Sequence, residues 1–83
     1  MMRRTMVADL VEALARVDRV LAKGEPIHHG AWRTQPVEVH VKHAVDHLRA
    51  WEAGDRGEPH LDHATTRCLM ALALVLAAEA TAP

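Results

Sequence analysis

With 83 residues, the chain is long enough for one small domain over residues 1–83, whose core is marginal unless a metal, a ligand or a second chain adds to it. Ten Lys and Arg residues nearly balance 11 Asp and Glu residues, so the basic footprint of a nucleic-acid binder is missing and no nucleic-acid partner is expected. Hydrophobic residues make up 49% of the chain but aromatic residues only 2%, a balance of Ala, Leu and Val that predicts an all-α fold.

Two segments bear on location. The N-terminal segment contains arginines, but Asp9 and Glu12 interrupt the apolar core that a signal peptide needs. The apolar run over residues 68–78 is shorter than the ~20 residues that span a bilayer. We therefore expect a cytoplasmic protein with no membrane partner, and a buried structural thiol at Cys68.

The first predicted helix covers residues 6–23. One face repeats apolar residues at helical spacing, namely Val7, Leu10, Val11, Leu14, Val17 and Leu21. Thr5 is its candidate N-cap and Gly24 its candidate C-cap. Residues 24–35 are predicted to form a loop, where Trp32 either plugs the open end of the core or offers a surface on which a planar ligand stacks.

The second predicted helix covers residues 36–53, with Pro36 at its first position. An apolar stripe predicts its core face, formed by Val37, Val41, Ala44, Leu48 and Trp51. His40 and His47 lie along one margin of this stripe. A short turn over residues 54–57 then predicts an antiparallel third helix over residues 59–80.

The third helix is apolar on nearly every side from Cys68 onward. A helix of this kind must be buried on several sides, and two other helices from so short a chain cannot enclose it. We therefore predict a three-helix antiparallel domain that is completed by oligomerisation. The partner is a second copy that covers the C-terminal half of the third helix in a homodimer or higher oligomer.

The antiparallel pair brings polar side chains together. We expect four of them around one pocket, closed by Trp32, and these are His47, His60, His63 and Arg67. Three interpretations remain open. In the first, imidazoles bind a transition metal such as zinc, with His43, His47, His60 and His63 as candidate ligands, although Arg67 would repel a cation.

In the second interpretation, Arg67, partly protonated histidines and the N–H groups that open the third helix bind a phosphate or a carboxylate. In the third, the same residues are polar edges of a helical interface, hydrogen-bonded to one another and to water. The residues themselves identify no catalytic group.

Four motifs follow one another in a suggestive order. A glycine-containing loop from Gly24 leads to Ala31-Trp32-Arg33, His47-Leu48 follows in a helix, residues 54–58 form a Gly-rich acidic turn, and the next helix opens with His60-Leu61-Asp62-His63-Ala64. On these motifs, residues 20–75 resemble the small phage and prophage domain known as the dATP/dGTP diphosphohydrolase N-terminal domain. That family is distantly grouped with the all-α nucleotide pyrophosphohydrolases.

The resemblance implies a nucleotide ligand and, if the protein is an enzyme, diphosphohydrolysis of a nucleoside triphosphate with Mg²⁺ or Mn²⁺. Two features depart from the family pattern. A Lys-Tyr pair of the loop is missing, since Pro26 and Ile27 occupy that region. The paired ExxE and ExxD carboxylates are missing too, and Mg²⁺ prefers such oxygen ligands.

The sequence therefore predicts a protein that binds a phosphorylated small molecule, above all a nucleotide, through Trp32, His47, His60, His63 and Arg67. Binding is better supported than hydrolysis. The alternatives are a non-catalytic module that sequesters a nucleotide or signal, and a structural homo-oligomer whose histidine cluster is incidental.

Overall fold

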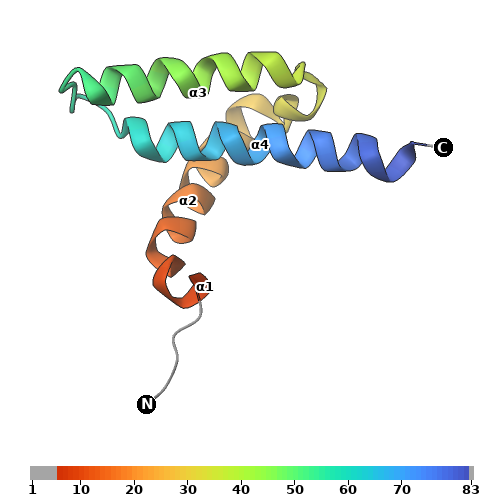
Figure 1. The fold of residues 1–83 in the computed structure, drawn as a ribbon, viewed down its shortest axis with the longest axis horizontal. Helices are drawn as coiled ribbons and strands as arrows, with labels where there is room; N and C mark the ends of the chain where they lie inside the picture. Colours follow the sequence, from red (N-terminus) through yellow and green to blue (C-terminus); the bar gives the residue numbers. More distant parts are fainter. Residues whose placement is uncertain (1–5, 83) are drawn as a thin grey trace.

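The computed structural model describes residues 6–82, and within this range it contains helices and no strands, which confirms the all-α prediction. The helices are α1 (Met6–Asp9), α2 (Val11–His28), the 3₁₀ helix η1 (Ala31–Thr34), α3 (Val37–Glu52) and α4 (His60–Thr81). α3 and α4 lie antiparallel, whereas α2 runs at a steep angle to them and packs against α4 (Figure 1). Thr5, the candidate N-cap, lies outside the described residues.

α2 ends five residues later than predicted, because Gly24 does not stop it, and the single helix predicted over residues 6–23 is interrupted at Leu10, between α1 and α2. The helix continues through Gly24 and Pro26 to His28. A glycine in a helix costs only about 1 kcal/mol, and Pro26 removes one backbone hydrogen bond close to the helix end, so neither residue forces the helix to stop. The chain leaves the helix at His29 and Gly30, whose φ values of 51° and 71° are left-handed. Gly30 suits this stop, because glycine adopts a left-handed φ without the strain that a Cβ would bring.

The core face of α3 differs from the predicted stripe. Ala44 is buried and Val37 is half-buried, but Val41, Leu48 and Trp51 are exposed. The helix is rotated so that the line through His40, Ala44 and His47 faces α4. This rotation lets the histidines hydrogen-bond across the interface, which the valine and leucine side chains cannot do.

The buried core is small and partly polar. Its apolar members are alanines apart from one valine, and they are Val17, Ala44, Ala64 and Ala71. Three polar side chains are buried with them, namely His40, His60 and Thr66. Among the described residues, no buried side-chain polar atom lacks a hydrogen bond. Small residues allow α3 and α4 to approach closely, and the hydrogen bonds offset the cost of burying polar groups.

α4 presents an uncovered apolar face. Its exposed large side chains are Leu61, Leu69, Leu72, Val75 and Leu76. Cys68 is exposed on the same helix, so the prediction of a buried thiol is wrong for the isolated chain. The C-terminal turns of α4 extend beyond α3 (Figure 1). Length and composition would also let α4 cross a membrane, although core helices of soluble proteins meet the same criterion.

The surface area indicates how open this arrangement is. The chain exposes 6695 Å², whereas a compact monomer of 9.2 kDa exposes about 4,900 Å². The radius of gyration, 14.7 Å, likewise exceeds the roughly 12 Å of a compact domain of this length. Oligomerisation through α4 therefore stays a prediction, and the large exposed area is the physical reason to expect it.

Candidate functional site

The structure divides the predicted binding residues between two places. Trp32, His63 and Arg67 line a groove between α2, η1 and α4. His47 and His60 instead meet near the turn that joins α3 to α4. The two places are neighbours, because the ring of His63 stacks on that of His47 with 5.1 Å between their centroids. The single pocket expected from the sequence is thus a groove with a histidine cluster beside it.

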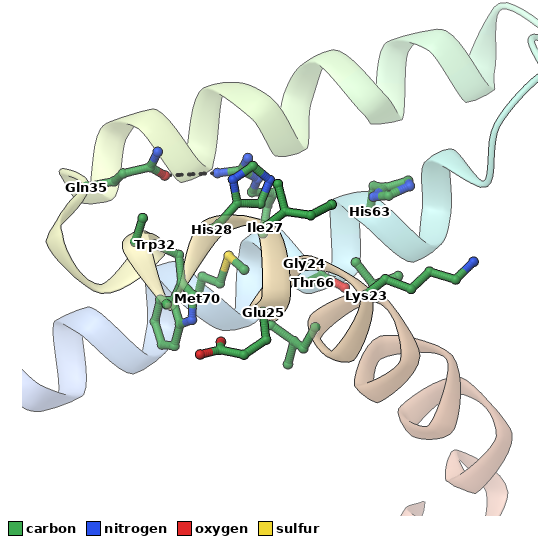
Figure 2. A pocket seen from close by; sticks show the side chains of 15 residues that line it. Lys23, Gly24, Glu25, Ile27, His28, Trp32, Gln35, His63, Thr66 and Met70 are labelled. Atoms are coloured by element: carbon green, nitrogen blue, oxygen red, sulfur yellow. Dashed lines mark hydrogen bonds between the residues drawn. The ribbon is translucent and has the colours of Figure 1, made fainter.

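The groove has a volume of about 440 Å³. Figure 2 shows Trp32 and Met70 toward one end, and His63 and Lys23 toward the other. Its wall combines apolar side chains from α2 and α4 with a set of polar ones, which are Lys23, Glu25, His28, Gln35, His63, Thr66 and Arg67. A mostly apolar cleft of this size with a few convergent polar groups is typical of small-molecule sites.

Arg67 is positioned by His40, a residue that the sequence reasoning left out of the site. The His40 side chain is fully buried, with 0% exposure. Its Nε2–H donates to the backbone carbonyl of Trp32 at 2.9 Å, so its Nδ1 is free to accept from Nη1 of Arg67 at 3.0 Å. One imidazole therefore connects η1, α3 and α4. The spacing of seven residues from His47 was a signal that His40 faces the same way.

The guanidinium of Arg67 has neutral partners. Its Nη1 donates to His40 and also to Oε1 of Gln35, at 3.2 Å. Over residues 6–82 no carboxylate forms an ion pair with it. The carboxylate in the groove wall is that of Glu25, which is exposed, and Lys23 brings a further positive charge to the same wall. Arg67 therefore brings a half-buried positive charge without an acidic partner to the groove.

Trp32 is placed both to plug the end of the core and to offer a stacking surface to a ligand, the two roles predicted as alternatives from the sequence. The indole is half-buried and meets His40 edge-on, with 6.4 Å between ring centroids and 72° between planes. Arg33 lies over the indole at 4.9 Å. Because Trp32 also lines the groove, it closes the end of the small core and remains available to a ligand.

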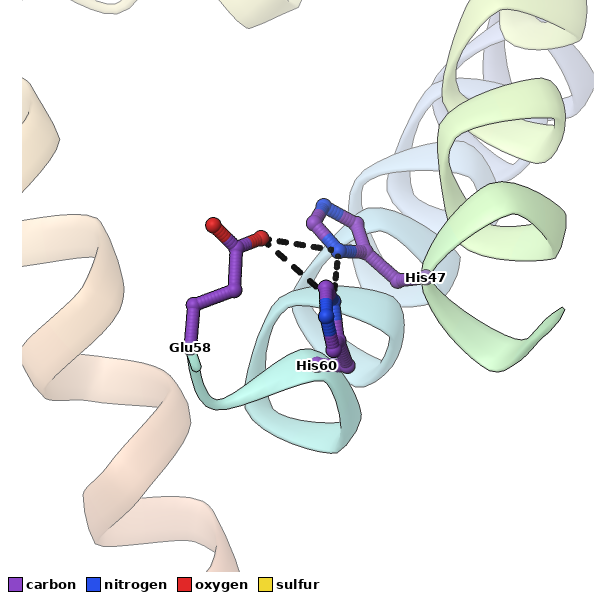
Figure 3. Close-up of side chains that lie close together, drawn as sticks. All are labelled: His47, Glu58 and His60. Carbon is purple, nitrogen blue, oxygen red and sulfur yellow. Dashed lines mark hydrogen bonds and ion pairs between the residues drawn. The ribbon is translucent and has the colours of Figure 1, made fainter. Parts of the chain in front are cut away.

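The histidine cluster joins α3, α4 and the turn between them. Nδ1 of His47 lies 2.8 Å from Nδ1 of His60, and Oε1 of Glu58 lies 3.4 Å from each of these nitrogens. The three side chains point toward one another from different segments (Figure 3). Of the four predicted metal ligands, His47 and His60 belong to this group. His43 and His63 do not, and Glu58 takes a place that the sequence reasoning did not assign.

Asp55 holds His60 in one orientation. Its Oδ1 accepts the backbone N–H of Gly57 at 2.8 Å, and its Oδ2 accepts Nε2–H of His60 at 2.9 Å. These two hydrogen bonds, the one from Gly57 first, lower the pKa of Asp55 below its usual value. The carboxylate thus keeps the proton of His60 on Nε2 and leaves Nδ1 as an acceptor toward His47.

Burial and the neighbouring histidines lower the pKa of His47. Its pKa is lowered from the ordinary value of 6.5, first by burial and then by His63, with smaller contributions from His60 and His43. The carboxylate of Glu58 opposes this shift without cancelling it. A neutral His47 can donate from Nδ1 to Nδ1 of His60, which accounts for their short separation.

This shift predicts a pH dependence of stability. In the unfolded chain His47 takes up a proton near pH 6.5, whereas in the folded chain it resists protonation. Its contribution to stability is therefore present above pH 6.5 and is lost as the pH falls below that value. We expect chelator-treated protein to melt at a lower temperature at about pH 5.5 than at about pH 7.5.

Replacing the histidine separates its effect from those of the other titrating groups. The His47→Asn variant should show a smaller decrease in melting temperature between the two pH values than the unaltered protein. His43→Asn, at an exposed position on the same helix, should show the same decrease as the unaltered protein. Equal decreases in all three proteins would mean that His47 does not contribute.

No family model, curated protein or solved structure matches this chain. The resemblance to the dATP/dGTP diphosphohydrolase N-terminal domain therefore stays a prediction from the order of the motifs.

Proposed function

We propose that this chain binds a small phosphorylated molecule, above all a nucleotide, in the groove lined by Trp32, His63 and Arg67. The observation that carries the proposal is the guanidinium of Arg67, which is half-buried, lines the groove and has only neutral hydrogen-bond partners. A positive charge in such a place favours an anion, because a charge removed from water is costly until it is paired.

The donors of Arg67 support phosphate as that anion. In residues 6–82 its hydrogen bonds come from Nη1, so Nη2 and Nε remain for a ligand. One guanidinium can donate two parallel hydrogen bonds to the oxygens of a phosphate, and these bonds are stronger than hydrogen bonds between neutral groups. His28, His63 and Lys23 line the same groove and add donors.

The rest of the wall supports a nucleotide rather than inorganic phosphate. Ile27, Met70 and the indole of Trp32 are apolar surfaces beside the charged group. Aromatic side chains stack on nucleobases of every kind. A volume of about 440 Å³ lies in the range of small-molecule sites, whereas a phosphate alone would fill little of it.

Binding is better supported than hydrolysis. Phosphoryl transfer depends on divalent ions that neutralise charge, and Mg²⁺ needs several oxygen ligands. Among the described residues of the groove wall, Glu25 is the one that carries a carboxylate. Diphosphohydrolysis with Mg²⁺ or Mn²⁺, which the family resemblance implies, is therefore the second candidate, and a module that holds its nucleotide intact is the first.

Calorimetric titration with a panel of nucleoside mono-, di- and triphosphates and inorganic phosphate, with and without Mg²⁺ or Mn²⁺, tests the proposal. Arg67→Gln should weaken nucleotide binding by about 10–100-fold, since it removes charge-assisted hydrogen bonds. Ile27 is 72% exposed, so Ile27→Asp should keep the fold while placing a repelling charge in the groove wall. Arg49→Gln, at an exposed position of α3, is the matched control and should bind as the unaltered protein does.

Chromatographic separation of the nucleotides after incubation with the protein distinguishes the binding module from the hydrolase. Unchanged nucleotide supports a binding module, whereas a nucleoside monophosphate together with inorganic diphosphate would show a hydrolase. The absence of binding across the panel would overturn the proposal. So would unaltered affinity in both Arg67→Gln and Ile27→Asp, with circular dichroism showing that the variants are folded.

A further inference from the structure

We infer that Nδ1 of His47, Nδ1 of His60 and Oε1 of Glu58 form a binding site for a zinc-like transition metal ion, with one coordination position left for water. This site lies at the turn between α3 and α4 and does not depend on a ligand in the groove. It also ties together two helices whose shared core is small, which is how a metal can stabilise a short chain.

The distances suit a tetrahedral ion. Ligands about 2.0–2.1 Å from zinc at tetrahedral angles lie about 3.3 Å from one another. Oε1 of Glu58 already lies 3.4 Å from both nitrogens. The nitrogens of His47 and His60 are 2.8 Å apart and would separate by about half an ångström as the ion replaces the hydrogen between them.

Asp55 accepts a hydrogen bond from the ring nitrogen of His60 that does not face the proposed metal ion. Metal-bound histidines usually donate their second N–H to a carboxylate or a carbonyl, which orients the ring and raises its basicity. Nε2 of His60 donates to Asp55 at 2.9 Å, and Gly57 fixes that carboxylate through its backbone N–H. The lone pair of His60 Nδ1 is thereby aimed at the cluster. On binding, the proton of His47 Nδ1 moves to Nε2, so both rings bind as neutral imidazoles.

The charge around the cluster favours a cation. Asp55 and Glu58 bring two carboxylates to the site. Arg67, which the sequence placed among the histidines, lies seven residues beyond His60 on α4, about 10 Å along the helix axis. It is held there by His40 and Gln35.

The ligands select the class of metal. Two imidazoles and one carboxylate suit Zn²⁺, Co²⁺ or Ni²⁺ better than Mg²⁺ or Ca²⁺, which prefer all-oxygen sites. His60 is buried, His47 is half-buried and Glu58 is exposed, so the ion would be reached from the side of the turn. Three protein ligands with a fourth position for water is the arrangement of reactive rather than closed zinc sites.

Titration of tag-free, chelator-treated protein with ZnCl₂, followed by calorimetry and by thermal unfolding, tests the site. We expect one Zn²⁺ per chain, a raised melting temperature, and the visible spectrum of tetrahedral coordination when CoCl₂ is used. Glu58→Gln, at an exposed position, should weaken Zn²⁺ binding without unfolding the chain. Asp55→Asn should weaken it by about 10–100-fold, because it removes the contact that orients His60.

His43→Gln is the matched control, since His43 lies one turn before His47 on α3 and is exposed. It should bind Zn²⁺ as the unaltered protein does. Two results would overturn the inference: no stoichiometric binding by the unaltered protein, or binding that both Glu58→Gln and Asp55→Asn leave unchanged. Because this test uses the metal alone, its failure is distinct from a failure of nucleotide binding.

Discussion

His40→Ala is expected to lower the free energy of unfolding by about 2–4 kcal/mol. The imidazole is completely buried and forms hydrogen bonds to Trp32 and Arg67. Alanine would leave a cavity between α3 and α4 and deprive a half-buried guanidinium of one of its two partners. For a domain of this size, the change corresponds to a decrease in melting temperature of roughly 10 °C or more.

Chemical denaturation followed by circular dichroism measures this effect. His43→Ala is the control, because it removes the same side chain at an exposed position of the same helix. It should change the free energy of unfolding by less than about 0.5 kcal/mol. An equal effect of the two substitutions would show that His40 does not join η1, α3 and α4.

Leu72→Glu combined with Leu76→Glu is expected to abolish the predicted self-association and leave a monomer. The two side chains are 52% and 53% exposed on the uncovered face of α4. In a twofold assembly each leucine is buried twice, so the double substitution removes about 4 kcal/mol or more of hydrophobic stabilisation. That loss weakens association roughly a thousandfold.

Sedimentation velocity over a range of concentrations measures the association. Ala73→Glu combined with Ala77→Glu adds the same charge to exposed positions about 100° further around α4 and should leave association intact. A monomeric unaltered protein at about 100 µM would contradict the predicted oligomer. If that monomer floated with lipid vesicles, the apolar face would instead belong against a membrane.

The local spacing of residues in the sequence predicted the long helices of this protein and the approach of one histidine of α3 to two histidines of α4. Helical spacing of apolar residues indicated the long helices, and the short turn after Ala53 indicated that α3 and α4 are antiparallel. Because antiparallel neighbours bring the end of one helix beside the start of the next, His47 was expected near His60 and His63, where the structure has it.

The same pattern did not predict which face of α3 is covered. A stripe of valine and leucine marks a face that avoids water, but it does not say whether this chain or another molecule covers it. In the structure His40, Ala44 and His47 face α4, and Val41 and Leu48 remain exposed. The end of α2 was also mispredicted, because Gly24 and Pro26 weaken a helix without forcing it to stop.

The sequence by itself determined an all-α chain, an antiparallel pair of helices and a concentration of imidazoles at their turn. These follow from spacing along the chain, which sets helix faces and neighbours. Only the tertiary structure decided that Arg67 binds His40 and Gln35, and that Glu58 joins His47 and His60. Those contacts depend on the rotation of α3, on the steep crossing of α2 and on the course of the turn, which are set by packing between segments far apart in sequence.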